Sequence, residues 1–170
     1  KFGIPEAHAG RYFYTYNTGL ENQDVLYWMT GLDGESMCLL DPNKLSEDGT
    51  KALTGAAISN NGKFLAYGIS EAGSDWQEWF VRSVDEGIDL QDHLKWVKFS
   101  DAAWDAKDEG FYYSRYDAPG EGDLLKKTNY FQKLYYHKLG TQQGDDQLIY
   151  ERPDHKEWGF GGEVTQDGKY

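Results

Sequence analysis

Short stretches in which apolar and polar residues alternate recur along the whole chain. A period of two is typical of a β-strand with one buried face, because successive side chains point to opposite sides of a sheet. Each stretch is rich in aromatic or β-branched residues and is bounded by Gly, Asn or Asp, which favour turns. The pattern predicts eight or more strands, over residues 11–17, 25–30, 37–40, 63–70, 78–84, 110–116, 132–139 and 147–151.

Two segments between these stretches, residues 41–49 and 87–94, are compatible with a helical turn. We interpret both as connections between strands. Twenty Gly, thirteen Tyr, eight Phe and six Trp against only four Pro also favour strands and tight turns over helices. The expected fold class is therefore all-β.

Strands of this length occur in sandwiches, barrels and propellers, so internal repetition has to decide among them. Three segments share one plan of small residues, an apolar position, a polar turn ending in Gly and an aromatic strand. A repeat of about 50 residues with four strands is typical of a β-propeller blade. The three segments are residues 55–68, 100–114 and 161–170, and their turn glycines are Gly62, Gly110 and Gly168.

This repeat predicts a partial β-propeller of about three blades, each a four-stranded antiparallel sheet. Residues 1–10 are expected to be a linker that enters the propeller. Both ends are expected to be cut, and such a piece is expected to fold poorly alone because blade faces and strand edges are exposed. The expected blades are residues 11–54, 55–99 and 100–160, with the start of another at 161–170.

The charge of the chain bears on its partners. A formal net charge of -12 argues against nucleic acid and anionic membrane surfaces, since both require an excess of Lys and Arg. No window approaches the roughly 18 apolar residues of a membrane span. We therefore expect neither a nucleic-acid nor a membrane partner.

The single cysteine, Cys38, cannot form an internal disulfide and lies in an apolar run, where a buried small hydrophobic residue is expected. One cysteine favours the cytoplasm, with the periplasm as the alternative.

Catalytic and metal motifs are weak throughout. The nearest approach to the G-x-S-x-G nucleophile turn, residues 68–72, lacks the second Gly and is followed by a strand instead of a helix. The four histidines do not have metal-ligand spacing, so we expect no metal and no cofactor. His137 falls in an alternating strand and is interpreted as an exposed or hydrogen-bonded residue. Aromatic residues at strand ends either pack between blades or line a ligand site.

Five segments closely resemble the propeller domain of the prolyl oligopeptidase family, in collinear order over nearly the whole chain. That resemblance implies a seven-bladed propeller joined to an α/β-hydrolase domain with a Ser-Asp-His triad, which hydrolyses short peptides after proline. Because the triad follows the propeller in the family, no catalytic residue is expected in this chain. The segments are residues 11–27, 39–53, 59–76, 96–104 and 131–141.

The resemblance also implies site residues. Phe99 resembles the family's apolar contact for the side chain two residues before the proline, and Phe160 stands where a Met usually makes a second contact. Asp75 and Trp76 match the family in a segment that we assign to the interdomain surface. The implied partners are short proline-containing peptides and the hydrolase domain of the same full-length chain.

The resulting hypothesis is a propeller fragment of a proline-specific serine endopeptidase that gates access and contacts substrate, and that is inactive by itself. The alternative is a non-enzymatic propeller that acts as a binding module. The residues that follow Tyr170 in the gene would discriminate the two, because only the first requires a G-x-S-x-G turn leading into a helix.

Overall fold

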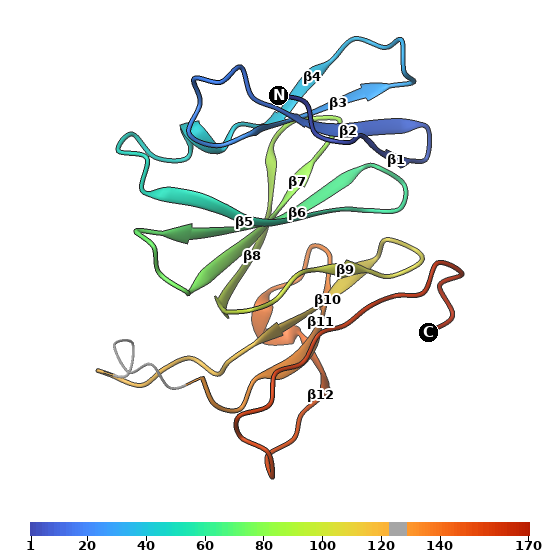
Figure 1. Cartoon of the computed structure of the whole chain (residues 1–170). Coiled ribbons are helices and arrows are strands. Elements are labelled where there is room, and N and C mark those ends of the chain that lie inside the picture. Colours follow the sequence, from blue (N-terminus) through green and yellow to red (C-terminus); the bar gives the residue numbers. More distant parts are fainter. Residues whose placement is uncertain (123–128) are drawn as a thin grey trace.

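The strands form three separate four-stranded antiparallel sheets, which the computed structural model describes over residues 1–122 and 129–170. Figure 1 shows the sheets stacked in chain order from the N-terminal end to the C-terminal end. In each sheet, strands consecutive in sequence are neighbours. The sheets contain β1 (Glu6–His8), β2 (Arg11–Tyr16), β3 (Val25–Thr30) and β4 (Met37–Leu40); β5 (Lys51–Ile58), β6 (Phe64–Glu71), β7 (Gln77–Ser83) and β8 (Asp89–Val97); and β9 (Ala103–Trp104), β10 (Gly110–Arg115), β11 (Lys133–Lys138) and β12 (Gln147–Tyr150).

The middle sheet is buried on both faces, and its alternating side chains explain why. Leu65 and Tyr67 of β6 belong to the core between the first and second sheets, where Phe13 and Trp28 also lie. Ala66, which lies between them in sequence, faces the core between the second and third sheets. The two cores bury apolar area that a single sheet could not cover, so each sheet depends on its neighbours.

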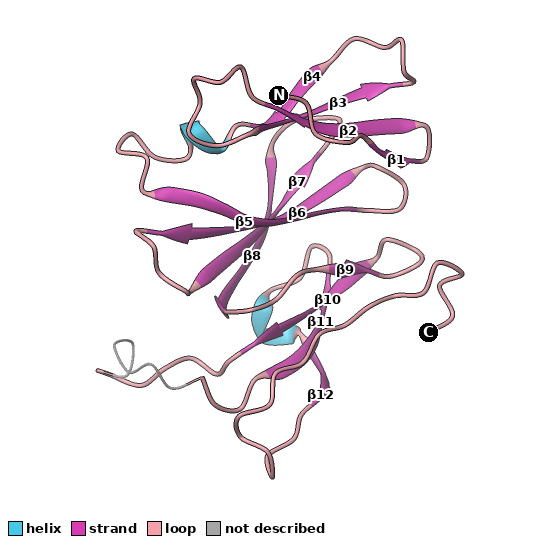
Figure 2. Ribbon diagram, viewed as in Figure 1, coloured by secondary structure: helices cyan, strands magenta, loops and turns pink. Residues whose placement is uncertain are grey.

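All eight strands predicted from the alternation are present, and the all-β fold of a partial propeller is confirmed. Residues 41–49 hold a short 3-10 turn, Pro42–Lys44, as predicted, and a second such turn spans Gln143–Asp145 (Figure 2). The interpretation of residues 87–94 as a connection is wrong from residue 89 onward, because residues 89–94 lie in the nine-residue strand β8. The polar side chain of Asp92 is buried in that strand, which hides its apolar alternation. The expectation that Cys38 is buried is also wrong, because it is exposed in β4.

Glu6–His8 form β1 of the first sheet, within the segment that we predicted to be a linker. Three residues are too few to show an alternation, and two of the three are exposed. The blade boundaries of the sequence analysis otherwise stay a prediction.

The three repeated segments contain the same turn, which a backbone hydrogen bond closes at corresponding positions. Ser59 N donates to Phe64 O at 2.9 Å, Asp105 N to Gly110 O at 3.0 Å and Thr165 N to Tyr170 O at 2.8 Å. The residue at the fourth position of each turn has positive φ, 68° at Gly62, 57° at Asp108 and 67° at Gly168. Gly110 is therefore not the turn residue that we predicted; Asp108 is, because Asp tolerates the left-handed region better than most residues. Residues 161–164, before the third turn, are not in a strand of the described structure.

Two sets of polar contacts connect the second and third sheets. The carboxylate of Asp108 accepts hydrogen bonds from the backbone N–H groups of Asn60 and Asn61, both at 2.8 Å. His137 of β11 is fully buried between Asp92 and Asp146. Of the two alternatives for His137, exposed or hydrogen-bonded, the second is confirmed. No helix in the described ranges is long and apolar enough to cross a membrane.

Candidate functional site

Phe99 lies in the connection from β8 to β9, and its side chain projects outward. The residue is 62% exposed, which is high for a Phe. Its φ of 52° is in the left-handed region, where a bulky side chain is strained. Non-Gly residues with such backbone strain cluster at functional sites, so this conformation marks Phe99 as a candidate contact residue.

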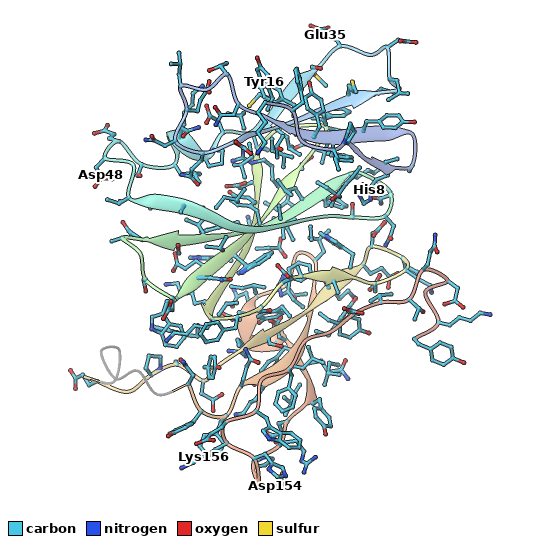
Figure 3. All side chains as sticks on the ribbon, in the orientation of Figure 1. His8, Tyr16, Glu35, Asp48, Asp154 and Lys156 are labelled. Carbon is cyan, nitrogen blue, oxygen red and sulfur yellow. The ribbon has the colours of Figure 1, made fainter. Side chains whose placement is uncertain are left out.

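Phe160 lies in the segment that follows β12. Its half-buried ring packs edge-on against Tyr150, with the ring centroids 5.2 Å apart and the planes at 83°. The same segment includes the loop with Asp154 and Lys156, which Figure 3 places at the opposite end of the molecule from Tyr16. Lys156 O in that loop accepts a hydrogen bond of 2.7 Å from Phe131 N.

The fold brings Phe99 and Phe160 to one hollow of about 490 Å³, although they are far apart in sequence. Its other lining residues include Tyr116, Asn129 and Gln132. A neighbouring hollow of about 720 Å³ includes Phe99, Asp101 and residues 161–164 in its lining. Phe99 therefore stands between two open spaces that an extended ligand can reach.

Gln132 is the residue of this site that the sequence analysis missed. It is 2% exposed, and its side-chain amide bonds to both segments that carry the two phenylalanines. Sequence offers no signal for this role, because Gln132 stands at the start of an alternating strand, where a solvent-facing polar residue is the ordinary expectation.

Trp76 lies in the hairpin between β6 and β7, beside the exposed Asp75. Its ring is perpendicular to those of Trp96 and Tyr116, with centroids 5.7 and 6.2 Å apart. The ammonium of Lys98 stands 4.1 Å from the centroid of the Trp76 ring, a cation–π contact. Because Tyr116 also lines the hollow with Phe99, Trp76 is linked to that hollow through one aromatic ring.

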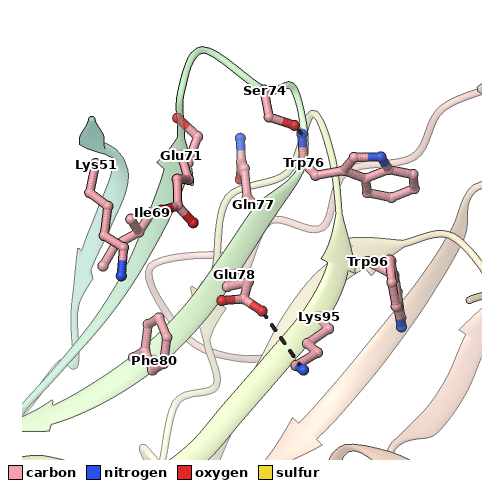
Figure 4. Close-up of a pocket in the computed structure, with 11 residues that line it drawn as sticks. Lys51, Ile69, Glu71, Ser74, Trp76, Gln77, Glu78, Phe80, Lys95 and Trp96 are labelled. Atoms are coloured by element: carbon pink, nitrogen blue, oxygen red, sulfur yellow. Dashed lines mark hydrogen bonds and ion pairs between the residues drawn. The ribbon is translucent and has the colours of Figure 1, made fainter. Parts of the chain in front are cut away.

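A separate groove of about 450 Å³ has Trp76 in its lining (Figure 4). Trp76 and Trp96 form one wall, and Lys51, Ile69 and Glu71 form the opposite one. Glu78 and Lys95 lie between the walls with 4.0 Å between carboxylate and ammonium, both side chains half exposed. An exposed ion pair of this length contributes little stability. Because both side chains are half exposed, the two charges are accessible to a ligand or to another domain.

The chemistry available at the hollow is binding chemistry. Burial raises the pKa of Tyr116, so its phenol stays neutral and supplies an apolar ring with one hydroxyl. Among the described residues, no group of three or more His, Cys, Asp or Glu is placed to hold a metal ion. The site can bury an apolar side chain against aromatic rings.

The whole chain, residues 1–170, matches the family described as "Prolyl oligopeptidase, N-terminal beta-propeller domain". It is 40% identical to a prolyl endopeptidase of Elizabethkingia meningoseptica over 95% of this chain and 23% of that protein. It is 37% identical to prolyl oligopeptidase A of Amanita bisporigera over 100% of this chain and 26% of that protein.

A solved structure gives the same picture. Prolyl oligopeptidase B from Galerina marginata, bound to a 35-residue hydrolysis and macrocyclization substrate, superimposes with a TM-score of 0.90 at 33% identity, over 99% of this chain and 26% of that one. The chain thus spans about a quarter of the length of the relatives it matches. With three stacked four-stranded sheets and this similarity over its full length, the chain belongs to the prolyl oligopeptidase family and forms part of its N-terminal β-propeller.

Proposed function

We propose that this chain is a fragment of the propeller of a proline-specific serine endopeptidase, in which it limits access to the active site and contacts the peptide substrate. The observation that carries the proposal is that Phe99 and Phe160, distant in sequence, line one hollow. Phe99 is 62% exposed and has a strained left-handed backbone, both of which cost stability. Binding of an apolar substrate side chain explains why such a conformation is kept.

Phe99 binds, in this proposal, the side chain two residues before the proline, and Phe160 forms a second apolar contact. An aromatic face suits that role because it buries apolar area without requiring one particular partner. Asp75 and Trp76 contact the α/β-hydrolase domain of the same full-length chain, which supplies the Ser-Asp-His triad. The chain therefore has no peptidase activity without that domain.

The experiment uses the full-length enzyme with Phe99→Ala. We expect kcat/KM to fall about tenfold for a peptide with a large apolar residue two before the proline, because the contact is lost. A shorter peptide without that residue should be cleaved at an unchanged rate, since it never reaches Phe99.

Tyr130→Ala is a suitable control, because Tyr130 is a part-exposed aromatic residue outside the lining of the hollow. It should leave both peptides unaffected. An equal loss on long and short peptides for Phe99→Ala would contradict the proposal and assign Phe99 a folding role.

Limited access is tested separately by substrate size. The full-length enzyme should cleave a short proline-containing peptide and leave the same sequence intact when it is part of a folded protein. We place the enzyme in the cytoplasm, since Cys38 is the single cysteine in these 170 residues, and fractionation of the source cells would test this.

A further inference from the structure

We infer that Gln132 is a positioning residue for substrate recognition, because it clamps the Phe99 segment to the Phe160 segment. The inference rests on the proposed function and adds residues that act by holding Phe99 and Phe160 in place. Its side-chain Nε2 donates to Lys98 O at 2.9 Å, next to Phe99, and its Oε1 accepts from Phe160 N at 2.6 Å. One buried amide therefore spans the two parts of the chain that line the hollow.

The orientation of this amide is determined by its partners. A carbonyl oxygen can only accept and a backbone N–H can only donate, so Gln132 satisfies both only with its amide nitrogen toward Lys98 and its oxygen toward Phe160. A glutamate in its place, when ionised, has no proton to donate to Lys98 O. The site thus requires both halves of an amide.

Ser114 of β10 forms a second clamp on the same two segments. Its hydroxyl donates to Phe160 O at 2.5 Å, and its backbone N–H donates to Ser100 Oγ at 2.8 Å. The backbone of Phe160 is therefore held at its N–H by Gln132 and at its C=O by Ser114. Phe99 is held through the residue on each side of it, Lys98 and Ser100.

These clamps explain how strained residues persist in an exposed connection. Like Phe99, Phe131, the residue that directly precedes Gln132, has a positive φ, of 63°. A left-handed bulky residue relaxes unless the surrounding contacts over-determine its backbone. Gln132 is 2% exposed and follows Phe131 directly, so its two hydrogen bonds hold Phe131 and Phe99 at once.

The test compares two substrates in the full-length enzyme: a peptide with a large apolar residue two before the proline, and a shorter peptide without it. The measured quantity is the ratio of their kcat/KM values. We expect Gln132→Leu to lower this ratio about fivefold and Ser114→Ala about twofold, in proportion to the hydrogen bonds each removes. Gln142→Leu is the matched control, because Gln142 is exposed and its side chain does not cap the turn that it precedes.

A role in positioning also predicts non-additivity. On the Phe99→Ala background, Gln132→Leu should cause little further fall in the ratio, because the group that it positions is already gone. A purely structural role would instead lower kcat/KM equally for both peptides and add to the effect of Phe99→Ala.

The outcomes separate the inference from the proposed function. If Phe99→Ala lowers the ratio but Gln132→Leu and Ser114→Ala leave it unchanged, the inference is overturned and the proposed function stands. If Phe99→Ala leaves the ratio unchanged, both fail. Should Gln132→Leu not accumulate as folded enzyme, Ser114→Ala decides by the same ratio.

Discussion

The imidazole Nε2 of His137 lies 2.7 Å from a carboxylate oxygen of Asp92, and this contact joins the third sheet to the second. Both side chains are buried, with exposed fractions of 0% and 1%. The other ring nitrogen lies 2.7 Å from a carboxylate oxygen of Asp146. Since each nitrogen faces an ionisable acceptor, the arrangement favours the doubly protonated imidazolium.

Stability is expected to fall as pH rises through the pKa of His137. Burial alone would lower that pKa, but the hydrogen bonds and charges of Asp146 and Asp92 outweigh burial and raise it to about 9. A raised pKa in the folded state means that the contribution is complete below the unfolded pKa of about 6.5 and is lost above about 9. Urea denaturation of the full-length protein at about pH 7 and about pH 10 should show the loss.

His137→Gln should remove most of this pH dependence and lower the free energy of unfolding by about 3 kcal/mol, because two buried carboxylates lose their cation. His93→Gln is the matched control, since the side chain of His93 is 38% exposed. A histidine variant that unfolds with the same pH profile as the parent protein would rule out this account.

Asp108 is expected to stabilise the contact between the second and third sheets. Its carboxylate accepts from two backbone N–H groups, at Asn60 and Asn61, and from the side-chain amide of Asn60. Asp108→Ala should lower the free energy of unfolding by about 2 kcal/mol, because it leaves these donors unpaired and places Ala at positive φ. Asp108→Gly removes the same acceptor without the φ strain, so it should be the milder variant in the same denaturation measurement. Equal losses would exclude a contribution from strain.

Gly68 permits the indole of Trp79 to lie against the middle of β6. A Cβ at this position would stand 2.5 Å from an atom of that indole, and Trp79 is 2% exposed in the core between the second and third sheets. Gly68→Ala should therefore displace Trp79 and destabilise the protein by about 1–3 kcal/mol. Tryptophan fluorescence and the Tm measure this. Gly144→Ala, where an added Cβ has open space, should leave both unchanged.

Trp76 is expected to support the proposed interdomain surface. Trp76→Ala removes part of one wall of the groove and the aromatic face under the Lys98 ammonium. We expect faster limited proteolysis between the domains of the full-length enzyme, because docking loses apolar contact area. Leu32→Ala, at a residue 65% exposed in the first sheet's loop region, is the control. Unchanged proteolysis would remove Trp76 from the interdomain surface.

The sequence predicted most of the fold because the relevant signals are local. Alternation over six to eight residues reports directly which face of a strand is covered, so β2, β3 and β6 were found close to their observed bounds. The strand β8 was missed because a buried Asp92 breaks its alternation, and β1 because three residues have no period. The turn position was misassigned at Gly110 because Asp108, and not a glycine, has the positive φ.

What the sequence by itself determined is the class of structure, the repeat and the family, together with Phe99 and Phe160 as candidate contacts. What only the tertiary structure decided is which polar groups hold those contacts together. Gln132 bonds to residues 34 and 28 positions away, and His137 to one 45 positions away. Such pairs depend on how one sheet packs against the next, and no local pattern encodes that register, because each partner alone looks like an ordinary surface polar residue.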